Sequence, residues 1–336
     1  MEARHCTEDP TAAYRALIAD EPLPGRDELY AGETLSARRP QPRHCGGSVT
    51  DDQTTARLAV LGAGVMGVGI ATLALGHGLG VLLVDVDAAK LDRAPIDVAT
   101  QLRLAQLMGA RSGEEPIGEL ATSTSVHDAA AATVVIEAIT EVAELKSKVL
   151  VELSDVVRPG TPLVSNTSSI PIDELAESLA RPGELVGTHF MNPPYLIETV
   201  EVIRGARTSE ATMAAVTSLL AALDRKAVVV RDAPGFVTSR ILHPMINDAV
   251  RVVQAGTATA DAVDTLMQGC LGHRTGPLRT ADLIGLDNLV DSLRVLHERT
   301  GDEGCLPCEL LLAKVRRGHL GRKSGRGFYR YEEALP

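Results

Sequence analysis

The stretch Leu61-Gly-Ala-Gly-Val-Met-Gly-Val-Gly69 lies directly after an apolar run, Leu58–Leu61, and begins a helical pattern. It contains the spacing GxGxxG, formed by Gly62, Gly64 and Gly67. In this spacing the first glycine permits a tight turn, the second lets the backbone approach a pyrophosphate, and the third allows close packing of the helix. The order of strand, glycine turn and helix predicts an α/β unit with an anion site at the helix N-terminus.

A second apolar run, Val81–Val84, ends at Asp85, about 20 residues after the glycine turn. An acidic residue in this place can accept hydrogen bonds from both hydroxyls of a ribose and repels a 2′-phosphate, so the sequence favours NAD over NADP. The residues predicted to bind this cofactor are Gly62, Ala63, Gly64, Val65, Met66, Gly67 and Asp85. The alternative is a structural glycine turn, followed by an acid that only begins the next helix.

Short apolar runs alternate with helical patterns from residue 57 onward, which predicts an α/β fold with a doubly wound, Rossmann-type parallel sheet. The predicted strands are 58–61, 81–84, 133–136, 162–164, 185–188 and 227–230. Beyond Asp232-Ala-Pro-Gly235, the amphipathic segments 241–253, 260–267 and 286–297 predict an all-α C-terminal domain. We therefore expect an irregular extension over residues 1–55, a dinucleotide-binding domain over 56–231 and a helical domain over 232–332.

The composition argues against several classes of protein. With 33 Lys and Arg against 44 Asp and Glu, the net charge is -11, which disfavours a general nucleic-acid binder. No apolar run approaches the ~20 residues that a membrane-spanning helix needs, and the N-terminus lacks a signal-peptide pattern, so we expect a cytoplasmic protein without a membrane partner. The five cysteines are an odd number and suggest no disulfide framework. Cys305 and Cys308 are more simply small core residues than ligands, and we expect no metal.

The segment 187–203 sets His189 and Glu201 among apolar, strand-forming residues, where an unpaired charge would be costly. We therefore expect the two side chains to pair. A neutral imidazole held by a carboxylate accepts a proton well near pH 7, and the carboxylate also stabilises the imidazolium that forms. A general base is the leading interpretation, and the alternative is a buried histidine that satisfies a structural hydrogen bond.

Three further motifs follow the glycine turn in the sequence: Ser165-Asn-Thr-Ser-Ser169, Gly187-Thr-His-Phe-Met-Asn-Pro193 and Gly321-Arg-Lys-Ser-Gly-Arg-Gly-Phe-Tyr329. In this order, over about residues 57–331, the four motifs resemble the 3-hydroxyacyl-CoA dehydrogenase family. The resemblance implies NAD-dependent oxidation of a 3-hydroxyacyl thioester, of the 3-hydroxybutyryl-CoA type, in a cleft between the two domains. It also implies that the helical domain contributes to substrate binding and pairs two subunits into a homodimer.

By the same resemblance, His189 is the base that removes the hydroxyl proton, and Glu201 orients it. The competing carboxylate Glu198 falls on the opposite face of the same strand by period-two alternation. Ser168 hydrogen-bonds the substrate near the reacting carbon and also belongs to the cofactor contacts. The residues implied on the nicotinamide side of the cofactor are Glu141, Lys146, Asn192 and Lys323. Without the resemblance, the first two of these are more simply a solvated charge pair near a helix start.

Two departures from the family pattern bear on the substrate. Where the family has an Asn that contacts the thioester carbonyl, this chain has Ser239, which is shorter and offers a single donor. Where mitochondrial relatives carry lysines that grip the nucleotide end of coenzyme A, the segment 101–108 retains one cation, Arg103. An acyl carrier protein thioester does not need those lysines. The pattern also resembles a subgroup that acts on glyceryl thioesters of carrier proteins, in polyketide biosynthesis of hydroxymalonyl or methoxymalonyl extender units.

Two other interpretations stay open. Another NAD-dependent hydroxyacid dehydrogenase would share the glycine turn but generally use a lysine as its base, and the pair of His189 and Glu201 argues against it. A non-catalytic NAD-binding protein could keep the same fold, because a fold alone does not prove an activity. The expected partners are therefore an acyl-CoA or acyl carrier protein thioester and a second copy of the chain.

Overall fold

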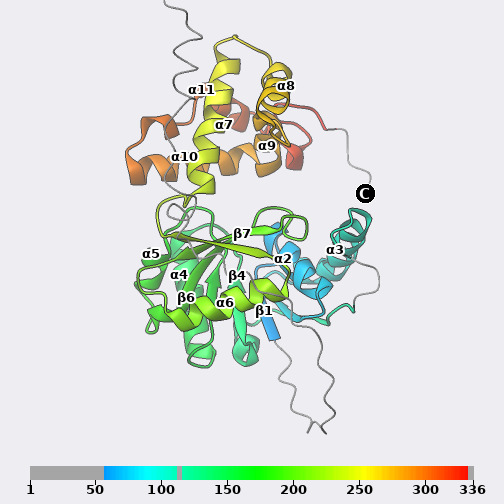
Figure 1. Ribbon diagram of the computed structural model, residues 1–336, viewed down its shortest axis with the longest axis vertical. Helices are drawn as coiled ribbons and strands as arrows, with labels where there is room; N and C mark the ends of the chain where they lie inside the picture. The colour runs from blue at the N-terminus through cyan, green and yellow to red at the C-terminus, as the bar shows by residue number, and fades with distance from the viewer. Residues whose placement is uncertain (1–56, 112–115, 332–336) are drawn as a thin grey trace, which may run out of the picture. The chain divides into compact units, whose positions relative to one another are not determined.

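The computed structural model describes residues 57–111 and 116–331, which Figure 1 draws in colour. The irregular extension expected over residues 1–55 lies outside the described residues. The described residues belong to one compact unit, which contains both the sheet and the helices that follow it.

Eight strands of the described chain form one sheet, in the spatial order β3-β2-β1-β4-β5-β6-β7-β8. Their bounds are β1 Arg57–Leu61, β2 Gly80–Val84, β3 Leu120–Ser123, β4 Val134–Glu137, β5 Leu163–Ser165, β6 Leu185–His189, β7 Thr199–Arg204 and β8 Lys226–Arg231. The six predicted strands are confirmed to within a residue at either end. Of the other two, β7 lies largely in the segment 187–203, which the sequence indicates as strand-forming. The short β3 escaped prediction because its side chains are mostly exposed and carry no apolar run.

The predicted parallel sheet is confirmed over β1 to β6, and one antiparallel pair occurs near its edge. Strands β1 to β6 run parallel, but β7 is antiparallel to β6, and β8 is parallel to β7. Residues 190–198, which join β6 to β7, are too few for the crossover of a dozen or more residues that a parallel neighbour requires. The chain therefore turns back, and the register places His189 directly opposite Glu201.

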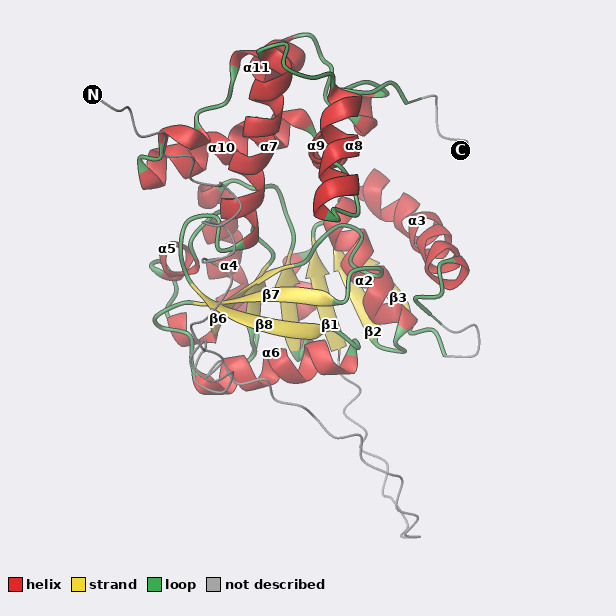
Figure 2. Cartoon of the chain, turned by 45° about the horizontal axis from the view of Figure 1, so that its top comes forward, coloured by secondary structure: helices red, strands yellow, loops and turns green. Residues whose placement is uncertain are grey.

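Helices cover both faces of the sheet (Figure 2). One apolar cluster joins the sheet to α2 (Val65–Gly76), α3 (Ala88–Leu107) and α6 (Glu210–Ala222). A second cluster on the other face joins it to the 3-10 helix η1 (Val126–Ala131), α4 (Ala143–Val156) and α5 (Ile172–Ala176). A further 3-10 turn, η2 (Pro182–Glu184), leads into β6. This three-layer arrangement leaves the loops at the carboxyl ends of β1, β2, β4, β5 and β6 along one edge, where ligands bind in doubly wound sheets.

The chain after the sheet is helical and has its own apolar core. Its elements are α7 Thr238–Gln254, α8 Ala260–Leu271, α9 Pro277–Ile284, α10 Leu286–Thr300, η3 Glu303–Cys305, α11 Glu309–Arg316 and η4 Arg322–Ser324. The three predicted helices correspond to α7, α8 and α10, and the shorter α9 and α11 were not predicted. Cys305 and Cys308 are both buried in this core as free thiols.

Over residues 57–111 and 116–331, the helices are all too short or too polar to cross a membrane.

Asp264 of α8 fixes the start of α9 and the C-terminal segment at once. Its carboxylate accepts hydrogen bonds from the backbone N–H groups of Leu278 (2.8 Å) and Arg279 (3.0 Å) and from the hydroxyl of Tyr329 (2.7 Å). The side chain is 2% exposed, so these donors would find no water in its place. Burial, followed by the hydrogen bond to Asp264, raises the pKa of Tyr329. The hydroxyl therefore remains a donor at physiological pH.

Asp264→Ala is expected to lower the free energy of unfolding by about 3 kcal/mol, because three buried donors lose a charged acceptor. Urea unfolding of the full chain, followed by circular dichroism, measures the change. Asp291→Ala is the matched control, since this carboxylate is 74% exposed and lies 3.7 Å from Arg294. Its effect should stay below about 0.5 kcal/mol, as for most surface ion pairs. Equal effects of the two substitutions would contradict the structural role of Asp264.

Candidate active site

The glycine turn between β1 and α2 makes a concave backbone surface. Gly62 has a φ of +99°, and a Cβ there would lie 2.5 Å from the Ala138 carbonyl oxygen. A Cβ on Gly67 would lie 1.7 Å from the Gly62 carbonyl oxygen, whereas Gly64 has open space to 4 Å. No side chain caps the N-terminus of α2, which begins at Val65 and continues with Met66. The first N–H groups of the helix are therefore available to an anion.

Asp85 follows β2 and is tied to this turn. Its Oδ2 accepts from the N–H of Ala63 at 2.7 Å, its Oδ1 accepts from the N–H of Asp87 at 2.9 Å, and Lys90 lies 3.6 Å away. A cavity of about 440 Å³ extends from Ala63 and Gly64 along the first half of α3. Open space at Gly64, free amide groups and a carboxylate at the end of β2 are the features that an NAD pyrophosphate and ribose require, so these residues fit the cofactor.

His189 and Glu201 form a buried pair across β6 and β7. The Nδ1 of His189 lies 3.2 Å from Oε2 of Glu201, and the two residues are 7% and 5% exposed. Thr238, the first residue of α7, donates its hydroxyl to the same Oε2 at 2.7 Å and also lies 3.2 Å from the His189 Nδ1. The N–H of Val237 donates to Oε1 at 2.8 Å. Glu198 is exposed and precedes β7. The expectation that it shares a strand with Glu201 is therefore wrong.

Glu201 is held as a carboxylate. Burial by itself would raise its pKa, but the hydrogen bonds from His189, Thr238 and Val237 together lower the pKa below its ordinary value. Because a carboxylate only accepts, the shared hydrogen must sit on Nδ1 of His189. In the neutral ring this leaves Nε2 with a free lone pair, able to take a proton.

An ion-pair cluster, buried except at Glu141, lies at the ends of β4 and β5. Lys146 is fully buried and donates to Oε1 of Glu137 at 2.6 Å, and it lies 3.3 Å from Oε2 of Glu141. Ser165 donates to the other oxygen of Glu137 at 2.7 Å. A solvated pair of Glu141 and Lys146 is therefore the wrong interpretation. Sequence reasoning missed Glu137, although its position as the last residue of an apolar strand could have indicated a buried partner.

Glu141 shapes the turn that carries Ser168. Its Oε1 accepts from the hydroxyl of Thr167 at 2.6 Å and from the N–H groups of Ser168 and Ser169 at 2.7 and 3.2 Å. Within the described chain the hydroxyl of Ser168 has no hydrogen-bond partner, so it is available to a ligand. Asn166 in the same turn accepts from the N–H of Phe190, which links the ends of β5 and β6 at 3.1 Å.

Three other residues were predicted for the site: Asn192, Lys323 and Ser239. Asn192 is exposed just after β6, and no hydrogen bond of its side chain is found in the described chain. Lys323 of η4 pairs with Asp287 at 2.7 Å, and no described contact joins it to Glu141 or Lys146. Ser239 is 2% exposed in the first turn of α7, next to Thr238. Ser239 thus follows directly on a residue that contacts both His189 and Glu201, whereas Lys323 is paired within the helical segment.

Sequence reasoning also missed Thr238 and His243. Both lie on α7, and His243 is one helical turn beyond Ser239 on the buried face. That spacing was the available signal for His243. No sequence signal for Thr238 was available, because its contacts depend on how α7 meets β7.

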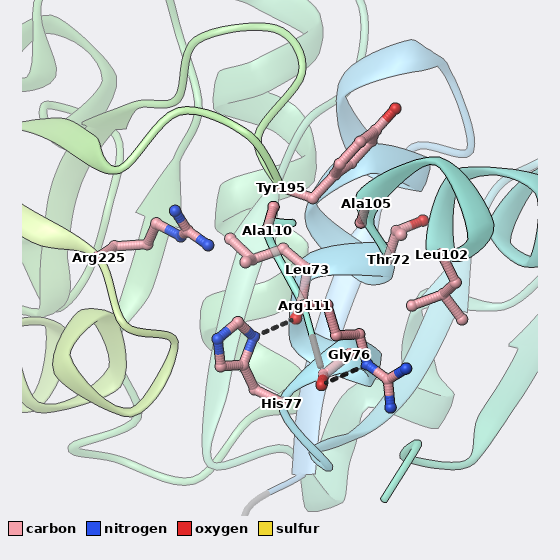
Figure 3. A pocket seen from close by; sticks show the side chains of 10 residues that line it. All are labelled: Thr72, Leu73, Gly76, His77, Leu102, Ala105, Ala110, Arg111, Tyr195 and Arg225. Carbon is pink, nitrogen blue, oxygen red and sulfur yellow. Dashed lines mark hydrogen bonds between the residues drawn. The ribbon is translucent and has the colours of Figure 1, made fainter. Parts of the chain in front are cut away.

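A second, much smaller cavity of about 10 Å³ lies between α2 and α3, beside Tyr195 and Arg225 (Figure 3). It has room for about one water molecule and is not a ligand site. In Figure 3 the Arg111 side chain donates to the Gly76 carbonyl at 3.1 Å along its wall. Across residues 57–111 and 116–331, no group of three or more His, Cys, Asp or Glu residues is suited to a metal ion.

Comparison with known protein families matches both parts of the chain. The NAD binding domain of 3-hydroxyacyl-CoA dehydrogenase matches residues 57–233, and the C-terminal domain of the same family matches residues 235–331.

Individual relatives support the same family assignment. A probable 3-hydroxybutyryl-CoA dehydrogenase of Bacillus subtilis is 42% identical over 280 residues, which cover 82% of this chain and 98% of the relative. A 3-hydroxybutyryl-CoA dehydrogenase of Bradyrhizobium diazoefficiens is 38% identical, with 83% and 97% covered. The crystal structure of (S)-3-hydroxybutyryl-CoA dehydrogenase from Ralstonia eutropha has a TM-score of 0.74 at 37% identity and covers 83% of this chain and 100% of that one. The chain therefore belongs to the 3-hydroxyacyl-CoA dehydrogenase family of NAD-dependent oxidoreductases.

Proposed function

We propose that this chain oxidises a 3-hydroxyacyl thioester, of the 3-hydroxybutyryl-CoA type, to the 3-oxoacyl thioester. One observation carries the proposal: His189 is buried at the carboxyl end of β6, and its Nε2 has no hydrogen-bond partner among the described residues. It lies along the same sheet edge as the glycine turn and Ser168. The carboxyl ends of parallel strands lie at the same edge of a sheet. The proposed base, substrate contact and cofactor site therefore share one edge. The names of the relatives support the choice of substrate.

In this proposal, His189 takes the proton of the substrate hydroxyl at Nε2, and Glu201 stabilises the imidazolium that forms. NAD, when bound, accepts the hydride that leaves C3 with its electron pair. Ser168 donates its hydroxyl to the reacting oxygen, and Ser239 donates to the thioester carbonyl in place of the Asn of the family. The reverse transfer uses the same groups, so the cofactor ratio sets the direction.

The cluster of Glu137, Glu141 and Lys146 contributes on the cofactor side. Two carboxylates, those of Glu137 and Glu141, face the single ammonium of Lys146, which leaves an excess of negative charge. Such an excess favours the positively charged nicotinamide of the oxidised cofactor. In this proposal Glu141, Lys146 and Asn192 contact the cofactor. Lys323 also contacts it, after its ion pair with Asp287 breaks.

His189→Gln is expected to lower turnover by roughly 10²- to 10⁴-fold, the usual effect of removing a positioned acid–base group. The affinity for NAD should stay within about twofold, since His189 contacts none of the residues of the glycine turn. Formation of NADH from 3-hydroxybutyryl-CoA measures turnover, and calorimetric titration with NAD measures affinity. Full turnover in the variant would exclude His189 as the base.

Asp85→Ala is the complementary variant for this experiment. Loss of its carboxylate should lower the affinity for NAD more than the affinity for NADP. Turnover at saturating NAD should remain near that of the unchanged chain. If Asp85→Ala weakened the two cofactors equally, Asp85 would not be the ribose acceptor.

A second candidate is a glyceryl or other hydroxyacyl thioester on an acyl carrier protein. The charges of α3 favour it, because Lys90 faces Asp85 and Arg93 faces Asp97, at 3.6 and 3.8 Å. In the described part of this helix only Arg103 lacks an ion pair and is available to the phosphates of coenzyme A. We expect kcat/KM for a carrier-bound 3-hydroxyacyl group to exceed that for the same group on coenzyme A. A strong preference for the coenzyme A substrate would reject this candidate.

We also propose that the chain forms a homodimer through its helical segment. The support is a set of large apolar side chains that stay half or more exposed on α7, α8 and α9: Ile241, Leu266, Leu271 and Leu283. Exposed apolar patches of this kind mark protein contacts more often than free surface. Sedimentation equilibrium should give twice the chain mass of 35.5 kDa. A single-chain mass at micromolar concentration would contradict the dimer.

A further inference from the structure

The hydroxyl of Thr238 stands between the two members of the pair of His189 and Glu201. It donates to Oε2 of Glu201 at 2.7 Å and lies 3.2 Å from Nδ1 of His189. Nδ1 lies 3.2 Å from the same Oε2. Because Nδ1 carries the shared hydrogen, that hydrogen is divided between a carboxylate oxygen and a hydroxyl oxygen. Of the three distances, the shortest joins Thr238 to Glu201.

The acceptor positions of the Glu201 carboxylate are all in use. An ionised carboxylate has about four lone-pair positions on its two oxygens. Oε1 accepts from the N–H groups of Val237 and Thr238 at 2.8 and 3.3 Å, and Oε2 accepts from the hydroxyl of Thr238 and from His189. Burial by itself would raise the pKa of Glu201, and the hydrogen bonds from His189 and Thr238 lower it. The hydroxyl therefore binds the charged carboxylate and shares its Oε2 with the imidazole.

The contact between Nδ1 of His189 and Oε2 of Glu201 is long for a pair that becomes an ion pair. A hydrogen bond from a cationic nitrogen to a carboxylate is usually about 2.7–2.9 Å. At 3.2 Å, and with the oxygen shared, Glu201 stabilises a protonated His189 less than an unshared carboxylate would. The hydroxyl of Thr238 keeps its place in both states of the ring, since Nδ1 carries a hydrogen in each.

The other groups around His189 do not offset this effect. Burial, and then the charge of His189, lower the pKa of His243 on α7 to about 4, so His243 carries no charge near pH 7. Asn166, from the turn after β5, accepts from the backbone N–H that follows His189 and does not titrate. The ring of Phe236 meets the imidazole edge-on, with 6.2 Å between the ring centroids. Among the described residues, Glu201 is therefore the one charged group in hydrogen-bonding contact with His189.

We propose that Thr238 is a positioning residue for the base: its hydroxyl takes up part of the charge of Glu201, so that His189 gains a proton less readily. His189 then stays neutral, and able to accept the proton of the substrate hydroxyl, down to a lower pH. In the reverse reaction the imidazolium gives up its proton more readily. The inference rests on the proposed function, in which His189 is the base.

Thr238→Val tests this role, because valine keeps the shape of the side chain and puts a methyl group where water could otherwise replace the hydroxyl. Without the hydroxyl, Glu201 holds the imidazolium more strongly, so a higher pH is needed to remove its proton. We expect the acid limb of the pH profile of kcat/KM, for 3-hydroxybutyryl-CoA at saturating NAD, to move up by about one pH unit, the effect of one hydrogen bond on a proton equilibrium.

The reverse reaction gives a second readout of the same group. The alkaline limb of kcat/KM for 3-oxobutyryl-CoA at saturating NADH should move up in Thr238→Val as well, since it reports the loss of the same proton. Thr238→Ser keeps the hydroxyl and should keep both limbs of the unchanged chain. A merely structural defect would lower kcat/KM at every pH and leave both limbs in place.

Thr280→Val is the matched control. The hydroxyl of Thr280 on α9 donates to the Gly276 carbonyl oxygen at 2.9 Å, and no described contact joins it to His189 or Glu201, so both limbs should stay in place. Thermal unfolding followed by circular dichroism checks that each variant folds. Thr238 is itself exposed, so valine there disturbs no packed core. If Thr238→Val does not fold, Thr238→Ala decides, with a shift expected in the same direction.

Three results would overturn the role of Thr238 and leave the proposed function standing. They are limbs in Thr238→Val that coincide with those of the unchanged chain, limbs that move down, and an equal shift in Thr238→Ser. Two other results would overturn the proposed function itself: no NADH from 3-hydroxybutyryl-CoA with the unchanged chain, or full turnover in His189→Gln.

Discussion

The carboxylate of Glu201 is the interaction on which the rest of the site depends. It lies on β7, accepts from His189 on β6, and accepts from the hydroxyl of Thr238 and the N–H of Val237 where α7 begins. Three separate parts of the chain therefore converge on one buried charge. Removing one partner of such a buried group costs more than the pair itself contributes, because the remaining buried groups lose their hydrogen bonds.

The antiparallel return of β7 makes this convergence possible. If residues 190–198 had crossed over to a parallel strand, Glu201 would have ended at a different height from His189. The short connection instead sets the two residues in register at the edge where the parallel strands end. On the cofactor side, the cluster of Glu137, Lys146 and Glu141 similarly ties β4 to the turn after β5, with Glu137 and Lys146 buried and Glu141 partly exposed. Both halves of the site are thus fixed by carboxylates that accept hydrogen bonds from more than one element.

Local patterns in the sequence predicted much of this arrangement. The glycine turn, Asp85 and the six apolar strands follow from spacing and hydrophobicity over a few residues, and the pairing of His189 with Glu201 follows from the cost of burying either alone. The direction of β7, the partners Glu137 and Thr238, and the burial of Lys146 could not be predicted in the same way. Each depends on contacts between segments far apart in the chain, and the sequence around it shows only an ordinary acid, hydroxyl or lysine.

The central claim is that Glu201 holds the proton of neutral His189 on Nδ1 and leaves Nε2 free as the base. Nitrogen-15 NMR of histidine-labelled protein, with His189 assigned through His189→Gln, reads this tautomer directly. The structure predicts a protonated Nδ1 and an unprotonated Nε2 near pH 7, and a mixture of tautomers in Glu201→Gln. A proton on Nε2 in the unchanged chain would contradict the account.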